Sequence, residues 1–172
     1  MIRRMLVKLL VPIFVITVFM LCFASRANSQ KSNFSGSWVV NLPESDLGGA
    51  PSYTAIKRLT VQQKEDTIAI ERSLVKSNGE EYLAKEILKL DGKISEHFTL
   101  SKRKKIISTN WSEDGTEFNE IATYTLPEDN SKIDYKVIEK WKLSLDGEKL
   151  TIIRTTELPT HNYTITALYN KE

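Results

Sequence analysis

TEFNEIATYTL, residues 116–126, carries the pattern that shapes this chain. Its apolar side chains fall at every second position, with Phe118, Ala122 and Tyr124 on one parity. A period of two is typical of a β-strand that buries one face. Glu120 stands in the middle of that face, so a carboxylate is expected inside the molecule, where it must be paired or hydrated.

The same alternation recurs from Phe34 to Tyr169. The expected strands are 34–42, 54–64, 67–76, 80–90, 93–100, 104–112, 116–126, 134–145, 149–158 and 163–169. Tight hairpin signals separate several of them, at Asn78-Gly79, Asp91-Gly92, Asp114-Gly115 and Asp146-Gly147. These signals predict sequential antiparallel pairing, and the lack of a helical period after the first thirty residues excludes βαβ folds.

Ten strands linked in this way are more than a flat sheet holds, because strand twist curls the sheet onto itself. We therefore predict an all-β fold, an antiparallel up-and-down β-barrel of about 8–10 strands. The weakest strand is 93–100, and without it the count falls. Pro43–Ser52, with its prolines and paired glycines, is expected to be an irregular loop near a rim, where it would gate entry.

Residues 1–29 are expected to be a secretory signal peptide. A basic start precedes an apolar run from Leu9 to Phe23 and then small residues, which is the order of regions in such a leader. The apolar run is shorter than the roughly 20 residues that span a bilayer, and an uncleaved anchor is the alternative. Cleavage after Ala27 or Ser29 leaves a single domain, residues 30–172, in the periplasm or outside the cell.

Cys22 is the only cysteine, and it lies in the leader. Leu21 precedes it where a lipobox has a small residue, so lipoprotein anchoring through Cys22 is not expected. The cleaved protein should have neither a disulfide nor a stable membrane anchor, which fits a bacterial periplasm. The leader holds four of the 24 basic residues and none of the 22 acidic ones, so cleavage leaves a formal charge of −2. No nucleic acid partner is expected.

Five charged residues share the parity of the apolar face in mid-strand. They are Arg72, Glu86, Glu120, Glu139 and Arg154. An isolated ion in an apolar core costs several kcal/mol, so these groups are expected to be paired or hydrated near the waist of the barrel. They form either an Arg–Glu network that fixes strand register or a polar cavity that meets the head group of a ligand. Three acids against two bases favour a protonated glutamate, or a cationic or hydroxylated ligand.

Aromatic residues in the strands supply candidates for the wall of a pocket. The pocket-wall candidates are Tyr82, Tyr124, Tyr135 and Trp141. No nucleophile motif is present, and His97 and His161 stand alone without metal-ligand spacing, so we assign no catalytic residue, no metal ligand and no cofactor. The basic run Lys102–Lys105 is expected to be a solvated strand edge. Contact with an anionic surface, such as lipid head groups, is the alternative for this run.

Gly36 and Trp38 resemble the Gly-x-Trp signature that opens the first strand of lipocalins and their calycin relatives. The resemblance implies that Trp38 plugs the closed end of the barrel and stacks on an arginine from a late strand, for which Arg154 is the candidate. Ten strands also look like the fatty-acid-binding branch, although Pro43–Ser52 replaces its helical lid and its Arg-x-Tyr clamp is absent. The opening segment, with Asn41-Leu42 and Ser45-Asp46 before the paired glycines, is also similar to small secreted bacterial lipocalin-like proteins of uncharacterised role.

These observations predict a secreted or periplasmic protein that binds a small amphipathic or hydrophobic molecule inside a β-barrel. One alternative is a filled barrel, a structural or protein-interaction module of the cell envelope, which would contain no cavity. A second alternative is a barrel enzyme, an isomerase or hydrolase that uses the interior glutamates. Such an enzyme requires a carboxylate of raised pKa in a cavity that water can reach.

Overall fold

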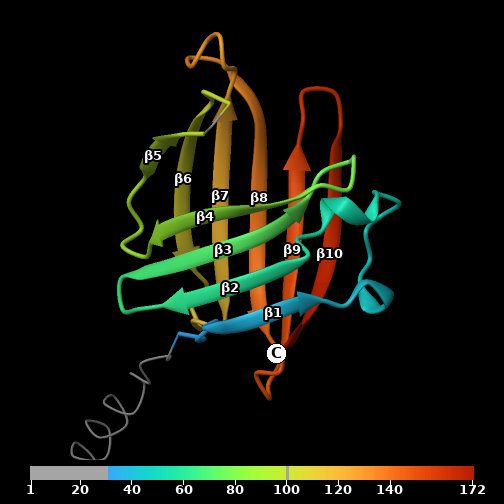
Figure 1. Cartoon of the computed structure of the whole chain (residues 1–172). Helices are drawn as coiled ribbons and strands as arrows, with labels where there is room; N and C mark the ends of the chain where they lie inside the picture. Colours follow the sequence, from blue (N-terminus) through green and yellow to red (C-terminus); the bar gives the residue numbers. More distant parts are fainter. Residues whose placement is uncertain (1–30, 100) are drawn as a thin grey trace, which may run out of the picture. The chain divides into compact units, whose positions relative to one another are not determined.

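Ten antiparallel strands form one sheet in the computed structural model, which describes residues 31–99 and 101–172 (Figure 1). The strands are β1 (Gly36–Val40), β2 (Arg58–Gln63), β3 (Thr67–Val75), β4 (Glu81–Lys89), β5 (Ser95–Phe98), β6 (Lys104–Trp111), β7 (Glu117–Thr125), β8 (Ile133–Leu143), β9 (Lys149–Glu157) and β10 (Asn162–Lys171). Every expected strand is present, and the weakest, β5, has four residues. The expected signal peptide, its cleavage sites and Cys22 lie outside the described residues.

The strands follow one another as a meander that turns back on itself. Their order in the sheet is β4-β3-β2-β1-β10-β9-β8-β7-β6-β5, because β1 pairs with β10. Strands β1 to β4 cross in front of strands β6 to β10 (Figure 1). The result is a nearly closed antiparallel barrel, so the predicted fold class is confirmed.

The predicted sequential pairing is confirmed at three of the four Gly turns and is wrong at Asp91-Gly92. Gly92 adopts the expected positive φ of 72°, but β4 pairs only with β3, and β5 pairs only with β6, within the described residues. In this part of the chain β4 and β5 form no backbone pairs with each other, and β4 is instead joined to β6 by a side-chain hydrogen bond. Thr109 Oγ1 of β6 donates to the Lys89 carbonyl of β4 over 2.5 Å.

Aromatic side chains fill one end of the barrel. Phe34, Phe118 and Trp141 are fully buried there, and their ring centroids lie 5.8 to 6.4 Å apart. Trp38 of β1 is also fully buried and donates from Nε1 to the Phe34 carbonyl over 3.0 Å. This packing closes the barrel at the end where β7 and β9 begin.

Pro43–Ser52 was expected to lack regular structure, and this expectation is wrong in part. Two 3₁₀ turns flank the segment, η1 (Leu42–Glu44) and η2 (Ser52–Thr54). Pro43 lies in the first turn of η1, where the fixed φ of proline suits a helix, and Pro51 caps η2. Between them, Asp46 exchanges backbone hydrogen bonds of 2.6 and 2.8 Å with Thr166 of β10. The segment is therefore fastened along β10.

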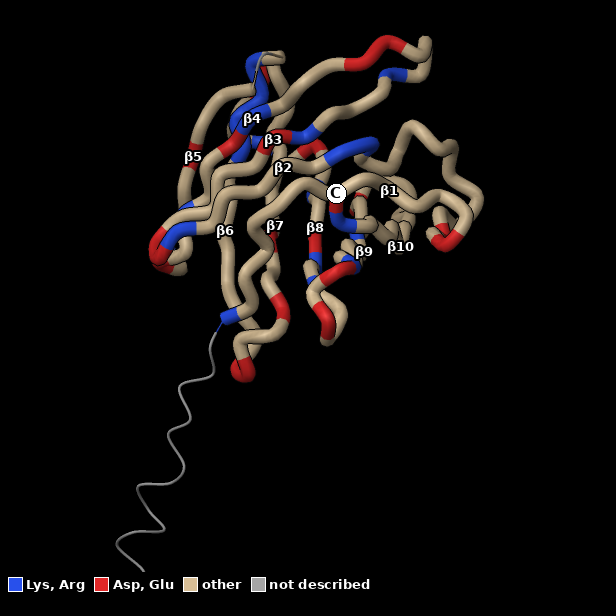
Figure 2. The backbone as a smooth tube through the Cα atoms, turned by 60° about the horizontal axis from the view of Figure 1, so that its bottom comes forward, with Lys and Arg blue, Asp and Glu red and all other residues tan. Residues whose placement is uncertain are grey.

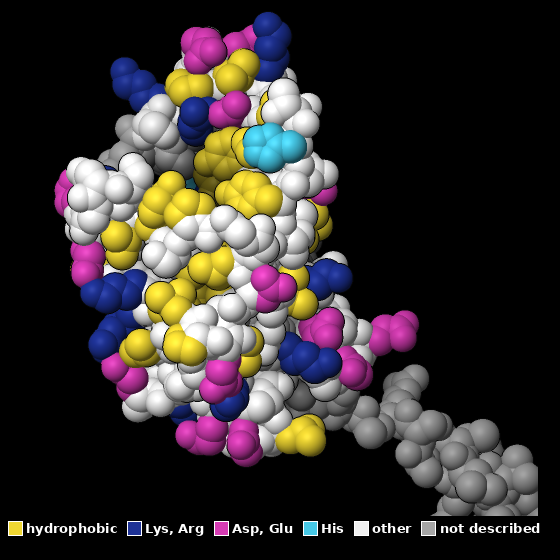
Figure 3. All heavy atoms as spheres, turned by 90° about the vertical axis from the view of Figure 1, so that its right-hand side faces the viewer, with side chains coloured by type: hydrophobic (Ala, Val, Ile, Leu, Met, Phe, Trp, Pro, Cys, Tyr) yellow, Lys and Arg dark blue, Asp and Glu magenta, His cyan; other side chains and the backbone are white. Residues whose placement is uncertain are grey.

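Residues of both charge signs occur at turns and along strands (Figure 2). On the face formed by β10 and the two 3₁₀ turns, hydrophobic side chains lie among charged ones and gather beside a histidine near the upper end (Figure 3). β4 and β5 are the two edge strands of the sheet. Their most exposed apolar side chains are Leu83 and Ile87 of β4 and Phe98 of β5. Residues 31–99 and 101–172 contain no helix long and apolar enough to cross a membrane.

Candidate functional site

A cavity of about 920 Å³ occupies the half of the barrel away from the aromatic plug. Its lining comes from β3 to β10, from Thr54 of η2 and from Thr99, Ser101 and Leu158, which follow strands β5 and β9. Apolar side chains form much of the wall. They include Leu74, Ala122, Val137 and Leu158 inside, and Leu83 and Phe98, which are 60% and 65% exposed, at its mouth. The interior is hollow, which is the opposite of what a filled barrel requires.

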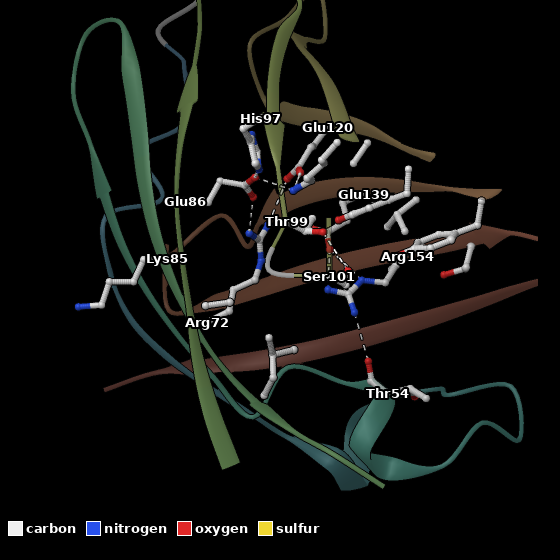
Figure 4. Close-up of a pocket in the computed structure, with 18 of the residues that line it drawn as sticks. Thr54, Arg72, Lys85, Glu86, His97, Thr99, Ser101, Glu120, Glu139 and Arg154 are labelled. Carbon is white, nitrogen blue, oxygen red and sulfur yellow. Dashed lines mark hydrogen bonds and ion pairs between the residues drawn. The ribbon is translucent and has the colours of Figure 1, made fainter. Parts of the chain in front are cut away.

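The floor of this cavity is a cluster of charged side chains from six strands (Figure 4). The five charges predicted from parity all lie in it. Arg72 stands at its centre and contacts three carboxylates, with Nη1 3.0 Å from Glu86 and Nη2 3.1 Å from Glu120 and 3.3 Å from Glu139. Strand register brings these side chains together. Glu120 lies directly opposite Glu139. Glu86 lies opposite Ile70, which is two positions from Arg72 on the same face of β3.

Arg154 and Trp141 complete the partners of Glu139. Arg154 Nε donates to Glu139 Oε1 over 2.8 Å, and its Nη2 lies 2.6 Å from the same oxygen. Arg154 Nη1 also donates to the Thr54 carbonyl over 3.2 Å. Trp141 Nε1 donates to Glu139 Oε2 over 2.9 Å. The Glu139 carboxylate is therefore held between two arginines and an indole.

Lys105 is the member of the cluster that the sequence interpretation missed. It belongs to the basic run that was expected to be a solvated edge, but its side chain is 8% exposed, and its Nζ lies 2.6 Å from Glu86 and 3.5 Å from Glu120. The signal was available, because Lys105 shares the parity of Ile107 and Thr109, which face inward on β6. With Lys105 the cluster has three cations and three carboxylates, so the expected acid excess is absent.

The three carboxylates differ in their titration. Burial would raise the pKa of Glu139, but the Arg154 and Arg72 guanidiniums and the Trp141 N–H bring it below its ordinary value. Burial is likewise outweighed at Glu86, whose pKa is lowered by Lys105 and Arg72. Burial prevails at Glu120 and raises its pKa, with the nearby Glu139 charge acting in the same direction. Both Glu120 oxygens already bind cations.

Three of the four pocket-wall candidates line the cavity. Tyr124 and Tyr135 stack with ring centroids 4.4 Å apart, and burial raises the pKa of Tyr135 to about 12. Tyr82 lines the cavity from β4 and is 43% exposed. Trp141 does not belong to the wall. It is fully buried in the aromatic plug. Trp141 follows Glu139 by two positions on β8, so both side chains lie on the same face of the strand and hydrogen-bond to each other.

Trp38 lies in the plug, but a different cation covers its ring from the one that the resemblance implied. Lys171 Nζ lies 5.5 Å from the ring centroid, whereas Arg154 binds Glu139. Gly36 has a φ of 147°, a region that favours glycine, and a Cβ there would lie 3.4 Å from Lys171 Cε. Gly36 and Trp38 therefore belong to the closed end and not to the cavity.

The two histidines lie in different surroundings. His97 lines the cavity, with Nε2 3.5 Å from Glu86 Oε1 and its side chain 45% exposed. His161 lies on the β9–β10 turn and stacks on Tyr163. Within the described part of the chain, no three side chains of His, Cys, Asp or Glu are grouped in a way that would hold a metal ion.

The comparisons with known proteins concern the fold. No family model matches the chain, and no curated protein matches it. Among solved structures, zebrafish ileal bile acid-binding protein complexed with cholic acid is similar, with 17% identity over 82% of this chain and 100% of that chain and a TM-score of 0.51. The fold is that of a lipocalin-like barrel. Secretory abundant heat soluble protein 4 from Ramazzottius varieornatus matches with 15% identity, 83% and 99% coverage and a TM-score of 0.49.

Proposed function

We propose that this lipocalin-like barrel binds a small amphipathic molecule in its interior cavity. The observation that carries the proposal is the cavity itself, with an apolar wall above a charged floor. A volume of about 920 Å³ falls within the range of ligand sites, which is roughly 300–1,000 Å³. The apolar part of the ligand would contact Leu74, Ala122 and Val137, and its polar end would point toward the cluster.

The structural neighbour supports this proposal in a limited way. The zebrafish protein of similar fold is complexed with cholic acid, an amphipathic molecule. A shared fold does not establish a shared ligand, so the proposal depends on the cavity of this chain. Its expected setting, the periplasm or the outside of the cell, follows from the leader sequence alone.

A substitution that fills the cavity tests the proposal. Val137 lines the cavity from β8, and Val137→Trp would place an indole in the space that a ligand needs. The matched control is Ile121→Trp, at an outward position 37% exposed on the neighbouring strand β7. Residues 31–172, which contain all ten strands and the whole described core, are the protein to use.

The measurement is native mass spectrometry after purification under gentle conditions, followed by titration with cholate and with twelve-carbon amphiphiles. We expect an added mass that leaves on activation in the unmodified protein and in Ile121→Trp, and its loss in Val137→Trp with the far-UV circular dichroism unchanged. Absence of any bound or added amphiphile from the unmodified protein would overturn the proposal.

A further inference from the structure

The charges that line the cavity are already paired with one another. Each lysine and arginine of the lining has a glutamate partner within the described chain: Arg72, Lys105 and Arg154 in the cluster, and Lys85 with Glu71 at 2.6 Å. No cation of the lining is left for an anionic head group without breaking an existing ion pair.

The carboxylates of the cluster are also fully paired with cations. All six oxygens of Glu86, Glu120 and Glu139 lie within 3.5 Å of an arginine or lysine nitrogen. A ligand carboxylate at the floor would therefore be a fourth anion beside three cations. Burying a charge without a partner costs several kcal/mol, and such a ligand would have to meet that cost.

Uncharged hydrogen-bonding groups remain free on the same wall. The hydroxyls of Tyr82, Tyr135, Tyr163 and Thr156 line the cavity and form no hydrogen bond to any other described residue. A hydroxyl donates one hydrogen bond and accepts two. The available chemistry of the wall is therefore that of alcohols, which pair well with alcohol, ester or amide groups of a ligand.

We infer that the cavity selects amphiphiles whose polar end is uncharged, such as an acyl chain or ring system carrying hydroxyl groups, over those that end in a carboxylate or an ammonium group. This inference rests on the proposed function. It adds the class of head group, which the fold comparison does not supply.

Three ligands with the same apolar chain test the inference: monododecanoylglycerol, dodecanoate and dodecyltrimethylammonium. Their affinities for residues 31–172 are measured by isothermal titration calorimetry at neutral pH, below the concentration at which each forms micelles. We expect the glycerol ester to bind at least about tenfold more tightly than either charged ligand, a difference of roughly 1.4 kcal/mol.

A charge variant makes the test sharper. Glu86→Gln removes one anion from the balanced cluster, so dodecanoate should gain about tenfold in affinity, or roughly 1.4 kcal/mol, while the glycerol ester changes little. Glu81→Gln is the control, since it removes the same charge from the same strand at an exposed site paired with Lys57, outside the cavity. Circular dichroism checks that both variants fold.

The outcomes separate the two claims. If dodecanoate or dodecyltrimethylammonium binds the unmodified protein as tightly as the glycerol ester, the inference is wrong and the proposed function stands. If none of the three ligands binds and native mass spectrometry finds no bound amphiphile, the proposed function fails and the inference fails with it. If none of the three binds while another amphiphile does, the inference is wrong and the proposed function stands. The comparison of ligands on the unmodified protein decides the matter even where Glu86→Gln does not fold.

Discussion

Glu139 contacts four side-chain nitrogens, more than any other carboxylate of the cluster: Nε and Nη2 of Arg154, Nη2 of Arg72 and Nε1 of Trp141. It is 3% exposed. Removing one member of a buried ion pair leaves the other charge without compensation, and this commonly costs about 3–5 kcal/mol. Its neighbours therefore depend on its charge.

We predict that Glu139→Gln lowers the free energy of unfolding by about 3 kcal/mol, because a neutral amide cannot balance Arg154 and Arg72. Urea unfolding followed by tryptophan fluorescence measures the change. Glu117→Gln is the control, since it removes an exposed partner of Lys142 and should cost below about 1 kcal/mol. Equal effects of the two substitutions would show that the cluster adds no more than a surface pair.

The acid side of the stability profile tests the pKa directions. Folding lowers the pKa of Glu86 and Glu139 below the ordinary value of 4.5, so the unfolded chain binds more protons as the pH falls below that value. The stability from these two groups is complete above pH 4.5 and is lost as the pH falls through their folded pKa values. The raised pKa of Glu120 has the opposite sign, because its contribution is lost as the pH rises through its folded value.

We therefore predict that the urea midpoint of unfolding falls as the pH is lowered from 4.5, and that Glu139→Gln flattens this fall. The midpoints of the two proteins should converge toward low pH, because the glutamate is then protonated in both states of the unmodified chain. Parallel profiles for the two proteins would contradict the lowered pKa of Glu139.

Single residues also show how much of the site can be predicted from the sequence. Parity alone was sufficient to predict Arg72, Glu86, Glu120, Glu139 and Arg154 as an interior set. Lys105 was missed because three basic neighbours made a surface edge the simpler interpretation, although Ile107 and Thr109 give its parity. The pairing itself was beyond prediction, since Arg72 and Glu139 are 67 positions apart and meet only when the sheet curls.

At the scale of elements, the open side between β4 and β5 is the feature that local signals did not predict. Asp91-Gly92 makes the turn that its sequence favours, but a turn signal says nothing of how far the two strands then diverge. β5 has only four residues to pair. Side chains make the contacts to β4 there: His97 of β5 and Lys105 of β6 reach Glu86, and Thr109 of β6 reaches the Lys89 carbonyl.

We predict that Thr109→Val loosens the end of β4. Valine keeps the shape of threonine and removes the hydrogen bond to the Lys89 carbonyl, a loss of about 1 kcal/mol. Native-state hydrogen exchange should show faster exchange at Leu88 and Lys89, with the amides of β8 unchanged. Thr123→Val, on the neighbouring strand β7, is the control. Unchanged protection in β4 would mean that the side-chain bridge does not hold the edge.

The whole molecule follows from strand alternation and turn spacing, which is why the barrel was predicted from the sequence. The same pattern did not predict the cavity. The alternation of inward side chains is identical whether the charged residues fill the barrel or line an empty space. The difference depends on side-chain volumes summed over β3 to β10. The plug shows this, since Trp38, Phe118 and Trp141 fill one end while the smaller Ala122 and Val137 leave the other end open.

The expected signal peptide gives the last prediction for the whole chain. Expressed in a bacterium with its own N-terminus, the protein should leave the cytoplasm and begin at Asn28 or Gln30, because small residues precede both cuts. Ala27 is the last residue before one cut and the third before the other, so Ala27→Lys should block both and leave the full-length mass. Asn28→Gln, at a position the peptidase does not read in either case, is the control. Intact mass spectrometry distinguishes these products. Two outcomes would contradict the predicted cleavage. In one, the unmodified chain keeps its full-length mass, and in the other it begins at a lipid-bearing Cys22.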